Sequence, residues 1–235
     1  MTDLLYQTDS YIKEFDAIVV ASFPDEKAVA LNRTAFYPGG GGQPNDVGKL
    51  SGLNVLKVRK AGDNILHILD GDLPAGGSTV HGVIDWDRRY KLMRTHTAMH
   101  ILCGRVFRDY GAQVTGGDME PLKGRMDFEF ERLQKELVTV IEAAINREVQ
   151  AGRDVRVKIL PREEAFQIPD LIRTKINLLP EGIQQVRTVE IVGLDLQADG
   201  GTHVKNTSEV GKIRVADYKS KGAINKRIYI EVLDQ

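Results

Sequence analysis

Two histidines lie four residues apart in a stretch with helical hydrophobic spacing. His96 and His100 belong to "RTHTAMH", residues 94–100. This separation places two imidazoles on one face of a helix, one turn apart, as a zinc site requires. The pair alone does not distinguish metal ligands from two histidines that share a helix by chance. Thr97 follows His96 where the H-E-x-x-H metalloproteases carry a glutamate, so the pair lacks the general base of that mechanism.

A second pair of ligand-type residues lies about a hundred residues later, in "QADGGTHVKNT", residues 197–207. The glycines between Asp199 and His203 allow the backbone to fold tightly and to bring both side chains to one side. Read alone, this stretch is typical of a surface turn. Combined with the helical pair it gives three nitrogens and one oxygen, and aspartate is an acceptable zinc ligand, although a harder one than thiolate.

Cys103 is an alternative ligand, because it follows His100 by three residues and so lies on the same helical stripe. The other interpretation is a small buried hydrophobic residue. The remaining histidines, His67 and His81, lie in a β-rich part of the sequence and have no ligand-type partner near them in the chain.

Four consecutive glycines occur in "TAFYPGGGGQPNDVG", residues 34–48. The stretch is not a P-loop, because no Gly-Lys-Ser/Thr follows and no helix begins after it. Glycines allow close approach of a partner to the backbone or several positive φ angles. The alternative is a flexible hairpin tip.

The composition is that of a globular protein. The 235 residues are 42% hydrophobic and 28% charged, with a net charge of −1. The single cysteine excludes an internal disulfide framework and a cysteine-rich zinc knuckle. The sequence contains no apolar run of the roughly 20 residues that span a membrane and no signal-peptide pattern, so we expect a cytoplasmic protein without membrane association.

Positive charge is concentrated near the end of the sequence, where residues 205–227 hold seven basic side chains and two acids. Such a stretch attracts phosphates, although a solvated surface is the simpler interpretation. The basic residues are Lys205, Lys212, Arg214, Lys219, Lys221, Lys226 and Arg227.

The hydrophobic pattern changes near residues 85–89. Before this point, short β-favouring runs separated by Gly, Pro, Asn and Asp predict a small barrel or sandwich. After it, helical spacing predicts helices over 86–111 and 131–152, each ended by a glycine, with strands between and after them. We therefore expect an α+β protein: an N-terminal β-barrel-like domain, 1–87, and an α/β two-layer domain, 88–235, with a sheet packed on two long helices. The predicted apolar stripe of the second helix is Leu133, Leu137, Val140, Ile141, Ala144, Ile145 and Val149.

The motifs together resemble one family. "RTHTAMH", "DGGTHVKNTSEVG" (199–211) and "TAFYPGGGGQPNDVG" occur in the order and approximate spacing of the editing domain of alanyl-tRNA synthetase. They are closer still to the free-standing alanyl-tRNA editing proteins of the AlaX family, medium-length type, over essentially the whole chain. The resemblance implies a zinc-dependent deacylase that hydrolyses serine, and often glycine, mischarged onto tRNA(Ala).

The resemblance also implies roles for individual residues. His96 and His100 match the two helical zinc ligands of the family, and His203 matches the histidine of its Cys-Gly-Gly-Thr-His element. Asp199 stands where that element has cysteine, so this chain departs from the pattern at one ligand. Without a thiolate, we expect weaker selectivity for zinc and a more electrophilic metal.

The expected reaction is hydrolysis of the ester between an amino acid and the terminal ribose of the tRNA. Zinc lowers the pKa of a coordinated water or orients the substrate. The base is a metal-bound water, Asp199 or a ribose hydroxyl, and the sequence does not choose among them. To accept serine and spare alanine, the site must hydrogen-bond the serine hydroxyl. Thr97, Thr115 and Thr202 are the candidates near the motifs, and each has the alternative role of a local cap or packed residue.

The tRNA partner has two expected contact regions. Gln43 and Asp46 match family positions, and we expect their loop, with Gly41 and Gly42, to face the substrate or the tRNA end. We expect phosphate contacts along the basic stretch, and these position a nucleic acid without specifying its sequence. The residues assigned to these contacts are Lys205, Lys212, Arg214, Lys219 and Lys221.

Two other functions remain open from the sequence. One is a metal-dependent hydrolase of small esters or amides, and the other is a non-catalytic tRNA-binding module that has lost its metal. We infer no obligate protein partner.

Overall fold

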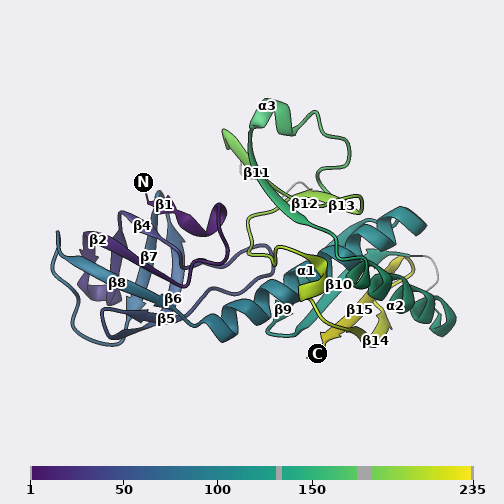
Figure 1. The fold of residues 1–235 in the computed structure, drawn as a ribbon, viewed down its shortest axis with the longest axis horizontal. Helices are drawn as coiled ribbons and strands as arrows, with labels where there is room; N and C mark the ends of the chain where they lie inside the picture. The colour runs from purple at the N-terminus through teal and green to yellow at the C-terminus, as the bar shows by residue number, and fades with distance from the viewer. Residues whose placement is uncertain (1, 131–133, 174–181, 234–235) are drawn as a thin grey trace. The chain divides into compact units, whose positions relative to one another are not determined.

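The computed structural model describes residues 2–130, 134–173 and 182–233 (Figure 1). The chain divides into two compact units, Met1–Tyr90 and Lys91–Gln235. Strands dominate and are combined with helices, so the expected mixed α and β character is confirmed. The helix α1, Trp86–Tyr110, contains the boundary between the two units, near the change of pattern in the sequence.

The first unit is a closed barrel in which every neighbouring pair of strands is antiparallel. Beside it, a two-residue parallel pair joins β1 (Asp3–Leu4) to β4 (Arg33–Thr34), and η1 (Leu5–Gln7) and η2 (Pro24–Glu26) are short 3-10 turns. Around the barrel the strands follow the order β2 (Glu14–Phe23), β3 (Ala28–Leu31), β7 (Asn64–Leu69), β6 (Leu53–Ala61), β5 (Gly48–Leu50) and β8 (Thr79–Ile84).

The barrel interior is filled by the alternate residues of its strands. On β2, Phe15, Ala17 and Val19 are buried while their neighbours are exposed, which is the period-two pattern of a half-buried strand. A Cβ atom at Gly82 would lie 2.4 Å from the Phe15 ring. Glycine at this position therefore allows Phe15 to pack across β8.

The second unit contains two antiparallel sheets instead of the single sheet that the sequence predicted. The additional strands β9 and β13 escaped prediction because β9 is glycine-rich and polar and β13 has only four residues. The four-stranded sheet has the order β14 (Ile213–Ser220), β15 (Asn225–Val232), β10 (Lys123–Glu129) and β9 (Val114–Glu120). The three-stranded sheet has the order β11 (Val155–Pro161), β12 (Gln185–Ile191) and β13 (Asp195–Ala198).

The two long helices end where the sequence predicted. α1 is followed by Gly111 at φ 65°, and α2 (Lys135–Gln150) by Ala151 and then Gly152 at φ 60°. Both glycines adopt the left-handed conformation that commonly ends a helix. The shorter α3 (Arg162–Ala165) and the 3-10 turn η3 (Thr207–Glu209) follow.

The predicted apolar stripe of α2 is partly wrong. Val140 is 54% exposed and Val138 is buried in its place, while Leu137 is half-buried. Because successive residues turn by about 100° around the helix, Val138 and Val140 point in nearly opposite directions, and only Val138 lies on the buried stripe. Leu133 lies outside the described residues. Within the described ranges, no helix carries an apolar stretch long enough to cross a lipid bilayer.

Candidate metal centre

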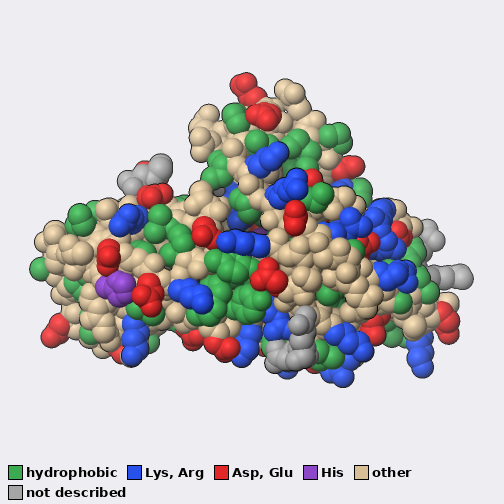
Figure 2. All heavy atoms as spheres, in the orientation of Figure 1, with side chains coloured by type: hydrophobic (Ala, Val, Ile, Leu, Met, Phe, Trp, Pro, Cys, Tyr) green, Lys and Arg blue, Asp and Glu red, His purple; other side chains and the backbone are tan. Residues whose placement is uncertain are grey.

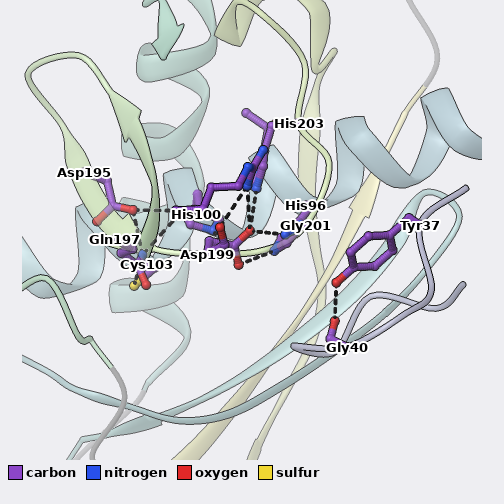
Figure 3. Close-up of polar contacts among 12 residues, drawn as sticks. Tyr37, Gly40, His96, His100, Cys103, Asp195, Gln197, Asp199, Gly201 and His203 are labelled. Atoms are coloured by element: carbon purple, nitrogen blue, oxygen red, sulfur yellow. Dashed lines mark hydrogen bonds and ion pairs between the residues drawn. The ribbon is translucent and has the colours of Figure 1, made fainter. Parts of the chain in front are cut away.

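Three imidazoles meet in the second unit (Figure 3). His96 and His100 project from consecutive turns of α1, and their ring centroids are 5.1 Å apart. The His203 ring, from the loop after β13, lies 4.2 Å from that of His96 and 4.8 Å from that of His100. All three side chains are buried. The four-residue spacing of the helix thus places both histidines against a loop that begins about a hundred residues later.

The Asp199 carboxylate lies where the three rings converge. Its oxygens are 3.0 Å from Nε2 of His203, 3.5 Å from Nε2 of His96 and 3.9 Å from Nε2 of His100. One ligand-type atom from each of the four residues lies within 4.8 Å of the others. The structure therefore brings together the four side chains that the sequence nominated as a metal site.

The loop that carries Asp199 and His203 is a structured turn. Oδ1 of Asp199 accepts a hydrogen bond from the amide of Gly201, 2.6 Å away, which forms an Asx turn. The backbone of Asp199 is held by β12, since its amide donates to the Arg187 carbonyl and its carbonyl accepts from the Arg187 guanidinium. These contacts fix the direction of the carboxylate before any ligand is considered.

Thr97 supports His203 from the helix side. Its hydroxyl accepts a hydrogen bond from the Val204 amide at 3.3 Å and lies 3.4 Å from Nδ1 of His203. Thr97 and Thr202 are both fully buried. Thr97 thus lies in the contact between the helix and the loop, and the role of both threonines toward substrate stays a prediction.

Burial and the neighbouring charges shift the pKa values of the four residues in different directions. Desolvation lowers the pKa of His96 to about 4 and lowers that of His203 well below its usual value. For His100, burial opposes protonation, but hydrogen bonds to Asp195 and Asp199 raise the pKa to about 9. Burial also opposes ionisation of Asp199, yet the surrounding histidines hold its pKa well below the usual range.

These properties suit a divalent cation. Asp199 is an anion at neutral pH, and His96 and His203 are neutral and so keep a lone pair for coordination. Buried imidazole nitrogens with one carboxylate oxygen form a donor set that zinc accepts. The convergence, the burial and the chemistry of the donors therefore fit the metal that the sequence motifs imply.

Behind His100 lies a group of residues that the sequence analysis missed. Oδ2 of Asp195 is 3.0 Å from Nδ1 of His100 and accepts from Nε2 of Gln197 at 2.6 Å. Gln197 also donates to the Cys103 thiol, whose pKa is raised by burial. Cys103 is not part of the four-residue group, although it was considered as a ligand. The sequence did hold a signal for this group: Asp195, Gln197 and Asp199 are polar and occupy alternate positions, as residues on one face of a strand do.

In the first unit, the glycine-rich stretch forms a tight turn. Gly40 and Gln43 exchange two backbone hydrogen bonds, and the Tyr37 hydroxyl donates to the Gly40 carbonyl at 3.0 Å (Figure 3). All four residues from Gly39 to Gly42 have positive φ, which side chains other than hydrogen disfavour. Gly41 and Gly42 form the tip of the turn, and Gln43 is buried at its end.

A buried ion pair holds the base of this turn. The Arg89 guanidinium, fully buried, donates to both carboxylate oxygens of Asp46 and to the carbonyls of Ser10 and Ala35. Asp46 also accepts from the Tyr37 amide at 2.6 Å. Since every one of these contacts joins segments of the first unit, the ion pair fixes the turn to the barrel.

The residues proposed to contact tRNA phosphates are exposed, but acids accompany some of them. Arg214 pairs with Glu231, and Lys219 lies 3.2 Å from Asp217. Figure 2 shows blue and red side chains interspersed on the visible face. Two further basic residues of the stretch serve local structure, since Lys226 binds the carbonyls of Gly222 and Ala223 and Arg227 pairs with Asp127. The positive surface is therefore weaker than the sequence count suggests.

Comparison with known proteins defines the class of protein. Residues 186–229 match the family described as "Threonyl and Alanyl tRNA synthetase second additional domain", and residues 8–88 match "tRNA synthetases class II (A)". A protein of Ignicoccus hospitalis named "Alanine--tRNA ligase" is 40% identical over 91% of this chain, which corresponds to 24% of the ligase. The chain is therefore related to the accessory domains of aminoacyl-tRNA synthetases.

Closer relatives match along their whole length. "Alanyl-tRNA editing protein AlaX-M" of Methanosarcina acetivorans is 39% identical over 100% of both chains. The protein of the same name from Saccharolobus solfataricus is 42% identical over 99% of both chains. The chain belongs to the AlaX-M family of alanyl-tRNA editing proteins.

Proposed function

We propose that this protein hydrolyses the ester bond of tRNA(Ala) that carries serine, and also of tRNA(Ala) that carries glycine. The observation that carries the proposal is the convergence of His96, His100, Asp199 and His203 within 4.8 Å in a member of an alanyl-tRNA editing family. In this proposal, residues 1–87 form the domain of the glycine-rich motif, and residues 88–235 form the deacylase domain.

In the proposed site, these four side chains hold one Zn²⁺ ion. Bound zinc supplies Lewis acidity, which polarises an ester and lowers the pKa of water. The protein's contribution is to hold the three Nε2 atoms and one carboxylate oxygen in a dry, fixed arrangement. The Asx turn and the Thr97 contact support this role, because they fix Asp199 and His203 through their own hydrogen bonds.

Among the roles that the sequence left open for Asp199, we favour that of a ligand. A carboxylate whose pKa lies well below its usual range is a weak base, and general base catalysis is most efficient when the pKa is near the operating pH. The same anion binds a cation well. With Asp199 as a ligand, two of the three candidates for the base remain: a metal-bound water and a ribose hydroxyl of the substrate.

Selection of serine over alanine requires a buried group that pairs with the serine hydroxyl, since such a site penalises the analogue that lacks it. We propose Thr97 and Thr202 for this role. A Thr97→Val variant separates two explanations. A smaller ratio of serine to alanine deacylation indicates that Thr97 contacts the substrate. Equal loss on all substrates indicates that Thr97 acts through its contact with His203.

For the tRNA itself, we propose contacts with the exposed basic residues and with the glycine-rich turn. Gly41 and Gly42 present backbone without side chains, which permits close approach of a ligand. Lys205, Lys212 and Lys221 are exposed and supply the non-specific phosphate attraction. Arg214 and Lys219 contribute less in this view because Glu231 and Asp217 accompany them.

The experiment that tests the proposal is deacylation of Ser-, Gly- and Ala-tRNA(Ala) by purified protein, with and without a chelator. We expect hydrolysis of the serine and glycine substrates, little hydrolysis of Ala-tRNA(Ala), and loss of activity with the chelator. Glu148→Gln is a matched control, because Glu148 is a buried acid of the same unit that pairs with arginines away from the cluster.

Two results would contradict the proposal. Tight tRNA binding without deacylation after zinc is added would identify a non-catalytic tRNA-binding module. Equal activity on free aminoacyl esters and on charged tRNA would identify a hydrolase of small esters.

A further inference from the structure

We propose that Asp195 is a positioning residue that fixes the His100 imidazole with Nδ1 protonated and Nε2 turned toward the candidate metal site. The inference rests on the proposed function in one respect, namely that His100 is a ligand. Asp195 is fully buried on β13 and is not among the residues that the sequence nominated for the site.

The hydrogen bonds determine which imidazole nitrogen carries the proton. Oδ2 of Asp195 accepts from the Gln197 amide nitrogen at 2.6 Å and lies 3.0 Å from Nδ1 of His100. A carboxylate only accepts, so the hydrogen of the second contact belongs to Nδ1. When the ring gives up its other proton to bind a metal, the lone pair lies on Nε2, which faces the Asp199 carboxylate at 3.9 Å (Figure 3).

Gln197 makes the orientation of Asp195 definite. Its amide nitrogen donates both to Asp195 and, at 3.3 Å, to the Cys103 thiol on α1. The same amide nitrogen is 3.5 Å from Nδ1 of His100, at the limit of hydrogen bonding, so the shorter contact with Asp195 defines the geometry of that ring nitrogen. On the opposite side, Oδ1 of Asp195 lies 3.5 Å from the Arg173 guanidinium, which balances the buried charge.

The helix itself is adapted to this contact. Gly104 follows His100 by one turn of α1, and a Cβ atom there would lie 2.9 Å from Cβ of Asp195 and 3.2 Å from the Leu194 carbonyl oxygen. Glycine is disfavoured inside a helix, so its presence requires a compensating reason. Here it allows β13 to approach the turn of α1 that carries His100. Metal-bound histidines commonly donate their second nitrogen to a carboxylate, which fixes the tautomer and orients the ring.

The test is the affinity of the protein for zinc chloride alone, measured by competition with a chromophoric chelator. We expect Asp195→Ala to weaken zinc binding by roughly 10- to 100-fold, the usual effect of losing an outer hydrogen-bond partner of a metal ligand. Asp195→Asn keeps an acceptor oxygen and should lose less. Glu148→Gln, the buried-acid control, should bind zinc as the unsubstituted protein does. Unchanged zinc affinity in both Asp195 variants would overturn the proposal.

Two further measurements separate a positioning role from a general loss of structure. In the zinc-loaded protein, ¹H–¹⁵N spectra of the imidazoles should assign the His100 proton to Nδ1, and a proton on Nε2 would overturn the inference. Gly104→Ala should weaken zinc binding in the same direction as Asp195→Ala, by pushing β13 away while leaving Asp195 in place. If Gly104→Ala bound zinc as tightly as the unsubstituted protein, the close approach of β13 to Gly104 would not have the role assigned to it.

Failure of this inference is distinguishable from failure of the proposed function. If the unsubstituted protein binds zinc and shows the Asp195 dependence but deacylates no charged tRNA(Ala), the positioning role stands and the proposed function is wrong. If it deacylates in a zinc-dependent manner and the Asp195 variants bind zinc unchanged, the function stands and the positioning role is wrong.

Discussion

The two units of the protein each bury histidine, but they satisfy it in different ways. In the barrel, His67 is fully buried, its Nε2 lies 2.8 Å from the Thr34 hydroxyl, and its Nδ1 lies 3.3 Å from the Val29 carbonyl. In the second unit, His96, His100 and His203 surround the Asp199 carboxylate. His81 is the exposed exception among the five histidines, all of which lie in described segments, and its ring lies close to the carboxylates of Glu14 and Asp16.

The difference teaches that burial alone does not make a histidine a candidate ligand. His67 satisfies both ring nitrogens with neutral groups, so it is complete without any ion. The three histidines of the second unit direct Nε2 atoms at one anion. Convergence of several donors on one point, rather than burial, distinguishes a metal site from a packed core residue.

The largest expected effect comes from removing one imidazole from the cluster, and the barrel histidine provides the comparison. Loss of a hydrogen-bond partner of a metal ligand costs up to about 100-fold in metal affinity. We expect His96→Ala and His203→Ala, which remove a ligand itself, to reduce deacylation and zinc affinity by more than that. His67→Gln should leave zinc affinity unchanged, although it loses stability. Steady-state deacylation of Ser-tRNA(Ala) and chelator competition on the same preparations provide the measurement. Full activity in both cluster variants would show that the site is assigned wrongly.

A second prediction concerns acid sensitivity of the barrel. Burial lowers the pKa of His67 from 6.5 to about 4. Between these two values the unfolded chain binds a proton that the folded chain does not, so stability falls as the pH falls through this window. Above pH 6.5 both states are neutral and the contribution is constant. The full shift corresponds to about 3 kcal/mol, since one pKa unit is about 1.4 kcal/mol.

The measurement is the free energy of unfolding in urea, determined between pH 7 and pH 4 for the unsubstituted protein and for His67→Gln. The difference between the two proteins gives the contribution of His67. The pH dependence attributable to His67 should vanish in the variant, while that of the second unit remains. Parallel pH curves for the two proteins would show that the barrel histidine is not held neutral by its surroundings.

The third prediction sharpens the chemistry of the convergent site. Asp199→Cys introduces a softer ligand at the centre of the three rings, and we expect zinc binding to tighten on the order of tenfold, with activity retained. Competition with a chromophoric chelator at fixed pH measures the change. Unchanged zinc affinity would place Asp199 outside the metal's ligands and would favour a different role for its carboxylate.

The smallest expected effects lie on the surface. Lys212→Ala should raise the KM for charged tRNA a few-fold and reduce its salt dependence by about one unit of the logarithmic slope, as for the loss of one phosphate contact. Arg214→Ala should have less effect, because its partner Glu231 already neutralises it. The measurement is KM across a salt series. A flat salt response in the unsubstituted protein would contradict the phosphate contacts.

The sequence predicted the periodic features of the molecule well. The length of α1 and the glycines after both helices follow from local patterns, because each reflects burial or backbone geometry within one element. Long-range features were not predictable in this way. The division of the strands between two sheets depends on pairings between distant segments.

For the candidate site, the motifs identified the four converging residues but not the groups that orient them. Asp195 and Gln197 belong to a strand too short to be predicted, and their importance follows from contact with a helix 95 residues earlier in the chain. Similarly, the burial of Arg89 against Asp46 could not be inferred, since a charged helix residue next to a domain boundary is usually solvated.

The central claim is that the convergent histidines and Asp199 hold one zinc ion on which deacylation depends. The most direct measurement is a titration of metal-depleted protein with zinc, in which bound metal and deacylation of Ser-tRNA(Ala) are followed together. We expect activity to be lost on depletion and to return in proportion to bound zinc, with saturation at one ion per chain, and we expect His203→Ala to abolish the return. Full activity of the metal-depleted protein, or binding of zinc without return of activity, would contradict the claim.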